Sequence, residues 1–355
     1  MTRCPTAATD PDLVHAMRGG IVESFHRGAF AVVDAQARVR HSVGDIERPV
    51  FPRSAVKVLQ ALPLVASGAA DALGLSDAEL ALACASHTGE PRHVETALSM
   101  LAKAGLDEAA LECGMHWPGG EAAARALARE GLQPGARHNN CSGKHAGFLC
   151  LGCLMARARG ADPRDFVRGY VRPDHPVMRE VAAALAATTG VDLARAPMGT
   201  DGCSIPTWGL PLRALATGFA RVATGEGLTA AHAAAAQRLR AAVAAQPWFV
   251  GGTGRFDTRV MERLGERVFC KVGAEGVYCA ALPEAGLGVA LKMDDGNNAR
   301  AAEVVMATLL LLLVDLSPSE AAFAQSLAVP PLLNWNGIRV GELRASDALQ
   351  AAVAR

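Results

Sequence analysis

The chain has 355 residues, 50% of them apolar, and its 35 basic side chains balance its 35 acidic ones. A chain of this length and apolar content can bury a sizeable core, which excludes a disordered protein. Zero formal charge, with no run of like charge, argues against nucleic acid or an anionic membrane surface as a partner. We therefore expect a soluble protein whose partner is a small molecule or another protein.

The nine cysteines are scattered rather than spaced as a disulfide framework, and the start of the chain lacks the apolar stretch of a secretory signal. The most apolar run, 304–316, is interrupted at Asp315 and is shorter than the roughly 20 residues that span a bilayer. These features predict a cytoplasmic protein with free thiols. Cys150 and Cys153 lie in an apolar run, so we interpret them as buried small side chains.

Alternation of β-branched residues between 21 and 43 predicts antiparallel strands, and the pattern from Ser54 to Leu264 is mostly helical. Helices are expected at about 76–86, 91–104, 121–130, 144–159, 176–189, 211–222, 228–245 and 299–315. Period two returns at 268–282 and 286–293, with a last strand near 338–342. We therefore predict an α+β fold in one catalytic unit, residues 1–355. Its antiparallel sheet joins strands at about 20–45 and 266–355, and a helical insert covers about 54–265.

A serine and a lysine stand three residues apart where the first long helix is expected to begin. Pro52 suits a first turn, and Ser54 and Lys57 would share one face with Cβ atoms roughly 5–6 Å apart. We expect the Lys57 amine to reach the Ser54 hydroxyl, because a buried neutral amine is a general base for a serine nucleophile. Alone the pattern is weak, since a helix-capping serine and a solvated lysine give the same spacing.

The breaks between the expected helices carry unusual polar residues. Ser86 lies on a turn before Pro91, as a site residue or as part of a helix-capping turn. Cys141 and Lys144 lie three apart at the start of an apolar helix, and Cys203 lies in a turn-rich loop. The two thiols could share a metal, but a closed zinc site needs four ligands and a lysine binds only as the free amine.

Two later segments complete the pattern. Glycines at 251, 252 and 254 lack the G-K-[ST] of a nucleotide loop, and we interpret them as backbone that lets a substrate approach, with Arg255 as an ion-pair partner or a carboxylate anchor. Lys271-Val272-Gly273 on a strand is close to the K-[ST]-G of serine acyl-transfer enzymes. Ser54/Lys57, Ser86 and Lys271 occur in the chain order of such enzymes, which favours acyl transfer.

Five motifs in order resemble the class 3, rhizobial-type L-asparaginases over about Gly28 to Val314. They are Arg53-Ser54-x-x-Lys57, Ala85-Ser86-His87-x-Gly89-Glu90, His138-Asn139-x-Cys141-Ser142-Gly143-Lys144-His145, Asp201-Gly202-Cys203 and Lys271-Val272-Gly273-Ala274-Glu275-Gly276.

The resemblance implies a fold similar to that of serine β-lactamases and glutaminases, and a homodimer. It implies two catalytic Ser–Lys pairs, Ser54/Lys57 and Ser86/Lys271. It places Arg53, His145 and Asp201 around the substrate, and Cys141, Lys144 and Cys203 on a zinc ion that a water completes.

The expected reaction converts L-asparagine to L-aspartate and ammonia through an acyl-enzyme on Ser54, and the roles of Ser54 and Ser86 could be exchanged. Zinc is expected to position Asp201 and His145 rather than to activate water. Three alternatives stay open: another serine hydrolase of the β-lactamase, peptidase or glutaminase type, an inactive zinc-containing binding protein, and a zinc hydrolase that uses metal-bound water.

Overall fold

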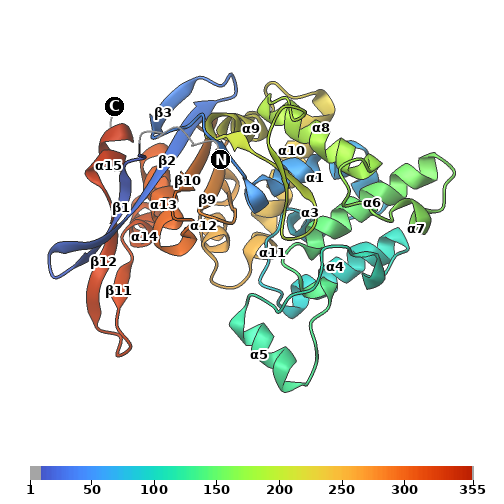
Figure 1. Cartoon of the computed structure of the whole chain (residues 1–355), viewed down its shortest axis with the longest axis horizontal. Helices are drawn as coiled ribbons and strands as arrows, with labels where there is room; N and C mark the ends of the chain where they lie inside the picture. Colours follow the sequence, from blue (N-terminus) through green and yellow to red (C-terminus); the bar gives the residue numbers. More distant parts are fainter. Residues whose placement is uncertain (1–8, 354–355) are drawn as a thin grey trace, which may run out of the picture.

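Strands from both ends of the chain meet in one antiparallel sheet in the computed structural model, which describes residues 9–353. Along the sheet the order is β11-β12-β1-β2-β10-β9-β8, and β3 pairs with β2 (Figure 1). The bounds are β1 (Asp12–Arg18), β2 (Ile21–Asp34), β3 (Val39–Val43), β8 (Phe269–Val272), β9 (Val277–Leu282), β10 (Leu287–Met293), β11 (Pro331–Leu333) and β12 (Arg339–Ala345).

The long strand β2 joins two parts of this sheet. Its first half pairs with β1, and its second half, from Gly28 to Asp34, pairs with β10. Gly28 lies at this change of partner, where an added Cβ would stand 2.4 Å from the Lys292 carbonyl oxygen. A residue without a side chain is therefore required where the two strands approach each other.

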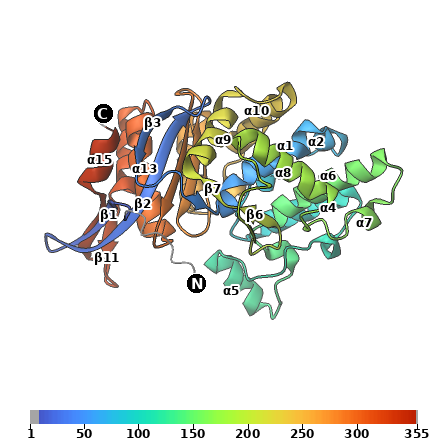
Figure 2. The ribbon, with the colours of Figure 1, turned by 45° about the horizontal axis from the view of Figure 1, so that its top comes forward.

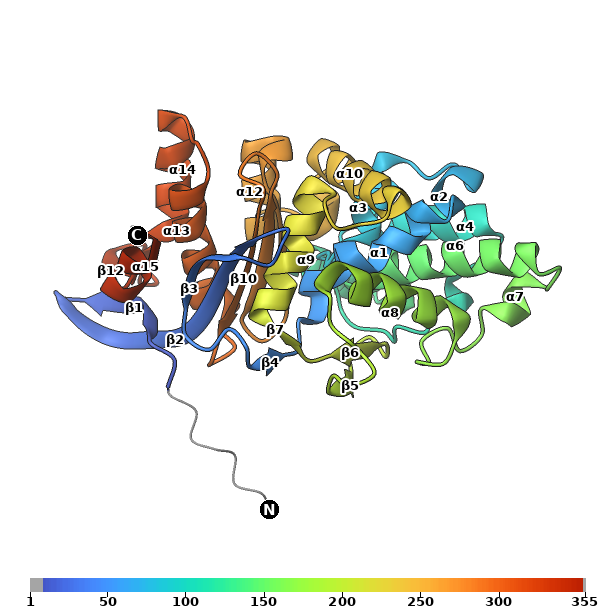
Figure 3. The same cartoon turned by 90° about the horizontal axis from the view of Figure 1, so that it is seen from above.

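Helices cover both faces of the sheet, with α13 and α14 on one side and α9 on the other (Figure 3). The helical lobe beyond α9 contains most of the other helices (Figure 2). The bounds are α1 (Lys57–Ala66), α2 (Ala69–Ala72), α3 (Asp77–Ala83), α4 (Pro91–Ala104), α5 (Glu121–Arg129), α6 (Ser142–Ala158), α7 (Pro163–Phe166), α8 (Pro176–Thr189), α9 (Leu212–Thr224), α10 (Ala230–Ala245), α11 (Trp248–Gly251), α12 (Phe256–Leu264), α13 (Glu303–Leu313), α14 (Pro318–Ala328) and α15 (Asp347–Val353).

The predicted α+β class is confirmed, with one antiparallel sheet built from both ends of the chain. That residues 1–355 act as a single catalytic unit stays a prediction. The strand β1 and the helix α14 were not predicted from the sequence, and α1 continues through Pro63 to Ala66. Within residues 9–353, no helix combines the length and the apolar character that a membrane crossing requires.

Short strand pairs brace the region between the sheet and the helical lobe. β4 (Pro49–Val50) pairs with β7 (Leu210–Pro211), and β5 (Met198–Thr200) pairs with β6 (Pro206–Trp208). The first pair leads directly into α1, and the second ends at the loop that carries Asp201 and Cys203. The segment that carries Ser54 and the loop that carries Asp201 and Cys203 are therefore both anchored by strand pairs.

Candidate active site

Ser54 lies in the turn that leads into α1, directly after a residue with a strained backbone. Arg53 has a φ of 52°, in the left-handed region that residues with a Cβ rarely adopt. Residues Arg53–Val56 form a 3-10 turn, η1, which continues into the buried helix α1. Backbone strain of this kind concentrates at functional sites, where the surrounding structure must hold it. The fold therefore presents Ser54 in a fixed orientation.

Lys57 is fully buried, and its amine has three acceptors. It donates to the Ala85 carbonyl oxygen, to Ser86 Oγ at 3.0 Å and to Cys141 Sγ at 3.1 Å. The predicted hydrogen bond to Ser54 is not formed: Ser54 Oγ, half-buried, has no hydrogen-bonding partner among the described residues. The buried amine is thus engaged with three acceptors other than Ser54.

Ser86 lies between two buried amines. Lys271 Nζ is 2.9 Å from Ser86 Oγ, opposite Lys57, and also donates to the Val272 carbonyl oxygen at 2.8 Å. Burial lowers the pKa of Lys271 to about 7, with the Lys57 charge adding to this and Asp257 opposing it. An amine with such a pKa is neutral in a large fraction of molecules near neutral pH, so it can accept a proton from Ser86.

Backbone contacts fix both sides of this lysine pair. The Ser86 N–H donates to the Val250 carbonyl oxygen at 2.9 Å, so the turn is tied to the glycine-rich break. Directly after β8, a Cβ at Gly273 would stand 2.6 Å from the Pro52 carbonyl oxygen. Because only glycine allows this approach, the K-x-G strand can lie against the turn that carries Ser54.

The glycine-rich break, expected to face a substrate, packs against the turn that carries Ser86. A Cβ at Gly252 would meet Thr88 Oγ1, so this glycine accommodates the turn that carries Ser86. Arg255, expected as an ion-pair partner or an anchor, forms no ion pair within residues 9–353. The break thus positions the turn that carries Ser86, and its predicted contact with substrate stays a prediction.

Cys141, Lys144 and Cys203 form a second buried cluster next to the first. Lys144 Nζ is 3.0 Å from Cys203 Sγ. A hydrogen bond from Cys203 holds the pKa of Cys141 well below its ordinary value against the effect of burial, and the nearby lysines add to this. Burial acts to lower the pKa of Lys144, but the Cys141 and Cys203 sulfurs outweigh it and the pKa is raised.

The donors of this cluster suit zinc only in part. Thiolates and a neutral amine are ligands that zinc accepts, and a fourth position would be left for water. No group of three His, Cys, Asp or Glu side chains that could hold a metal occurs in the described part of the chain. The third donor must therefore be Lys144, which has to lose its proton first.

The three residues predicted to surround the substrate border these clusters. Arg53 Nε donates to Asp201 Oδ1 at 2.6 Å, and Asp201 Oδ2 lies 4.0 Å from Cys203 Sγ. Burial would raise the pKa of Asp201, but Lys144 and Arg53 outweigh it and keep this carboxylate ionised. Burial holds the pKa of His145 well below its usual range, so this imidazole is neutral.

Two residues near the site were missed in the sequence. The Tyr170 hydroxyl is 2.6 Å from His145 Nδ1, and Asp257 Oδ2 is 3.9 Å from Lys271 Nζ. Tyr170 is one of only two tyrosines, which is a weak signal. Asp257 follows the glycine-rich break and stands in the first turn of α12, where an unusual polar residue could have been noticed.

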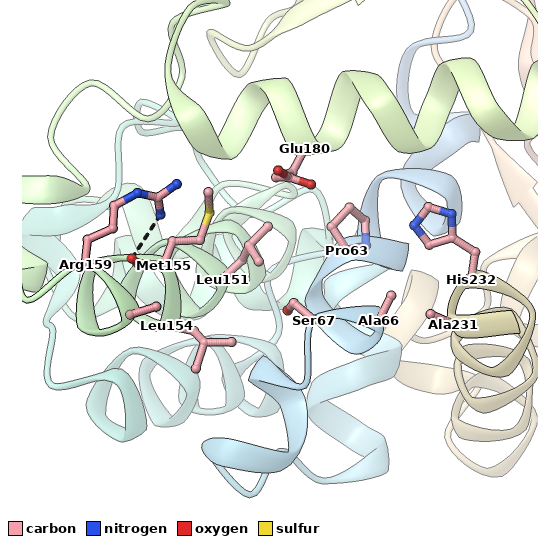
Figure 4. Close-up of a pocket in the computed structure, with 11 residues that line it drawn as sticks. Pro63, Ala66, Ser67, Leu151, Leu154, Met155, Arg159, Glu180, Ala231 and His232 are labelled. Carbon is pink, nitrogen blue, oxygen red and sulfur yellow. Dashed lines mark hydrogen bonds between the residues drawn. The ribbon is translucent and has the colours of Figure 1, made fainter. Parts of the chain in front are cut away.

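An open surface cavity of about 470 Å³ lies elsewhere on the helical lobe (Figure 4). Pro63 and Ala66 of α1 line it together with Leu151 and Met155 of α6, and Glu180 and His232 also line it. None of the predicted site residues lines this cavity. The candidate site is therefore defined by its buried contacts and not by this opening.

The sequence matches the model of the L-asparaginase II family over residues 14–345. The chain belongs to the L-asparaginase II family. This match covers every residue of the two clusters and confirms the predicted family resemblance, because nearly the whole chain takes part in it. No curated protein matches the sequence.

Solved structures with weak overall similarity include a β-lactamase from Mycobacterium bovis, with 16% identity, coverage of 80% of this chain and 93% of that one, and a TM-score of 0.37. A variant of simvastatin synthase from Aspergillus terreus has 12% identity, covers 75% of this chain and 86% of its own, and has a TM-score of 0.35. Scores this low add nothing on chemistry, so the function of this family member is argued from its site.

Proposed function

We propose that this member of the L-asparaginase II family hydrolyses L-asparagine to L-aspartate and ammonia through an acyl-enzyme. The observation that carries the proposal is Ser86 Oγ between two fully buried lysine amines, at 3.0 and 2.9 Å. Burial of amines beside a hydroxyl is the arrangement that a Ser–Lys hydrolase needs for proton transfer at neutral pH. The family supplies the amide substrate.

Ser54 is the proposed nucleophile. Its hydroxyl is half-buried and has no hydrogen-bonding partner among the described residues, and it directly follows the strained Arg53 in the chain. On substrate binding, Lys57 exchanges one of its acceptors for Ser54 and takes the proton as Ser54 Oγ attacks the side-chain amide carbon. Catalytic hydrogen bonds often form only in the substrate complex.

The second pair then assists departure of ammonia. Ser86 contacts both amines, so a proton can pass between Lys57 and Lys271 and reach the leaving nitrogen. Water afterwards attacks the ester on Ser54 and releases aspartate. In the exchanged assignment Ser86 forms the ester and Ser54 orients the substrate.

The ion pair of Arg53 and Asp201 fits the two charged groups of an amino acid. A guanidinium can bind the α-carboxylate and a carboxylate the α-ammonium group of L-asparagine. Arg53 directly precedes Ser54 in the chain, and its ion pair holds the ionised Asp201 at the Arg53 side chain. His145, neutral and fixed by Tyr170, provides a further hydrogen-bonding ring nitrogen.

We also propose that Cys141, Lys144 and Cys203 hold Zn²⁺ in the active protein. The bound ion would fix these side chains and shape the pocket beside Asp201 and His145, a structural role. Support comes from the two thiols and the amine gathered in one buried cluster. The Ser–Lys pairs need no metal-bound nucleophile.

A homodimer completes the proposal. Apolar side chains are exposed on two neighbouring hairpins, with Ile21 and Phe25 on β2 and Leu333, Trp335 and Ile338 on or beside β11 and β12. In the described sheet β11 is an edge strand paired only with β12, and such an edge can pair with its own copy about a two-fold axis. Sedimentation velocity measures the assembly state.

The function is tested by ammonia release from L-asparagine. Ser54→Ala, Ser86→Ala and Lys57→Ala should each lose at least about a hundredfold in rate, since removal of a nucleophile or base typically costs that much. Ser67→Ala, an exposed serine that ends the same helix, is the matched control and should keep wild-type activity. Full activity in both active-site serine variants would refute the mechanism.

Acid quenching during turnover, followed by peptide mapping, locates the acyl group. We expect the ester on Ser54, whereas an ester on Ser86 assigns the exchanged roles. L-Glutamine and a chromogenic β-lactam are the comparison substrates, because a faster rate with either would assign another serine hydrolase.

A further inference from the structure

Asp257 is a buried carboxyl that the proposed reaction does not yet use. It lies in the first turn of α12 and is 2% exposed. Its Oδ2 stands 3.9 Å from Lys271 Nζ and accepts a hydrogen bond from the Val272 N–H at 3.3 Å. Its Oδ1 is buried and has no hydrogen-bonding partner among the described residues.

These contacts place Asp257 behind the amine that touches Ser86. One carboxyl oxygen holds both the side chain of Lys271 and the backbone that follows it on β8, so the carboxyl fixes the direction of the amine. Two buried ionisable groups this close cannot titrate independently, because each charge is poorly solvated and acts strongly on the other.

We infer that Asp257 is a positioning residue that acts with Lys271 as one proton-holding pair, keeping the amine on Ser86 and stabilising the ammonium when Lys271 takes up a proton. The inference rests on the proposed function, in which Lys271 exchanges a proton with Ser86. In that step the Ser86 O–H bond breaks and an N–H bond forms on Lys271, and the carboxylate of Asp257 balances the new charge.

Other charged and titratable groups act on the pair from the elements around it. Arg255 precedes α12, Glu303 begins α13, Lys57 begins α1, and Cys270 neighbours Lys271 on β8. Their charges act on the pair from a distance, and the described side chains show no contact of Glu303 or Arg255 with Lys271. Asp257 is the carboxyl closest to the Lys271 amine among these.

The pKa shifts of Asp257 and Lys271 are those expected of a coupled pair. Burial raises the pKa of Asp257, and the Lys271 charge opposes this rise. Asp257 in turn opposes the lowering of the Lys271 pKa. Removal of the carboxylate should therefore lower the pKa of Lys271 further, and the acid side of the rate profile should move to lower pH.

The experiment measures kcat/KM for L-asparagine against pH in wild type, Asp257→Asn and Asp257→Glu. Asp257→Asn should shift the acid midpoint downward by about one pH unit and reduce kcat about tenfold or more. Asp257→Glu, which restores a carboxylate, should recover part of the shift. Glu79→Gln is the control, because Glu79 is a buried carboxylate that forms an ion pair with Lys103 outside the site. The pH profile of this variant should match that of wild type.

A second readout needs no turnover and no variant of Asp257. In wild type carrying ¹³C at lysine Cε and aspartate Cγ, the Lys271 and Asp257 resonances should share apparent midpoints. Unequal, independent midpoints would overturn the inference, as would a folded Asp257→Asn with an unshifted profile. If wild type fails to hydrolyse L-asparagine but the midpoints coincide, the proposed function fails while the coupled pair stands.

Discussion

The serine cluster (Ser54, Lys57, Ser86 and Lys271) and the thiol cluster (Cys141, Lys144 and Cys203) both contain buried lysines. The pKa values of Lys271 and Lys144 are shifted in opposite directions. Lys271 has Ser86 and a backbone carbonyl as its near partners, and burial lowers its pKa to about 7. For Lys144, burial is outweighed by the sulfurs of Cys141 and Cys203, and the pKa is raised. Where the near acceptors are neutral, burial determines the direction in which the pKa of the amine shifts. A nearby thiolate instead stabilises the protonated amine and raises its pKa.

This difference assigns different chemistry to similar side chains. An amine with a lowered pKa can take a proton from a hydroxyl and return it, so Lys271 suits catalysis. An amine held as a cation beside the Cys141 thiolate suits a structural role, or a metal site once its proton is lost. Lys57 contacts both clusters, through Ser86 on one side and Cys141 on the other.

Removal of the Lys271 amine should have the largest effect. Lys271→Met should lower kcat for L-asparagine by at least about a hundredfold, because the base beside Ser86 is lost. In wild type the rate should fall as pH drops below about 7, since the Lys271 amine becomes protonated there. Lys292→Met, a partly buried lysine on β10, is the control and should keep both rate and profile.

The measurement is a pH–rate profile from ammonia release. A wild-type rate that stays level from pH 8 to pH 5 would contradict the assignment of Lys271 as a proton acceptor. A Lys292→Met profile that moves with Lys271→Met would point to a general change of fold.

Changes in the thiol cluster should act on metal content more than on chemistry. Cys203→Ser and Lys144→Met should lose most bound zinc after dialysis and lower the melting temperature, with a smaller loss of rate than Lys271→Met. Zinc should also be released as pH falls, because the proton favoured on Lys144 competes with the metal. Elemental mass spectrometry and calorimetry provide these values.

Cys150→Ser is the matched control, since Cys150 is a buried thiol of α6 outside the cluster. Wild type with no retained zinc and full activity would end the metal proposal. The difference in pKa between Lys144 and Lys271 would then be explained by Cys141 and Cys203 without a metal.

The smallest effect on activity is expected at the exposed hairpins, which are remote from both clusters in the sequence. Trp335→Ser combined with Leu333→Ser should convert the dimer to a monomer by removing apolar area from the proposed contact, without changing the rate per chain. Leu132→Ser, an exposed apolar residue after α5, should leave assembly unchanged. Sedimentation velocity distinguishes the states, and a monomeric wild type would contradict the proposal.

Local patterns in the sequence determined much of this protein. The periodicity predicted α4, α8 and α10 closely, because an amphipathic or alanine-rich segment carries its own helical signal. The order of the motifs also predicted the family and the residues that gather at the site, since each motif is a short run with a local turn or helix start.

Only the tertiary structure decided which groups meet. Lys57 bonds Ser86 and Cys141 instead of Ser54, and Asp257 stands behind Lys271, although the partners are far apart in the chain. Spacing along one helix fixes which side chains share a face, but packing of separate elements fixes which acceptors surround a buried amine. The acceptors set the pKa of each lysine, so the distinction between Lys271 and Lys144 came from the fold.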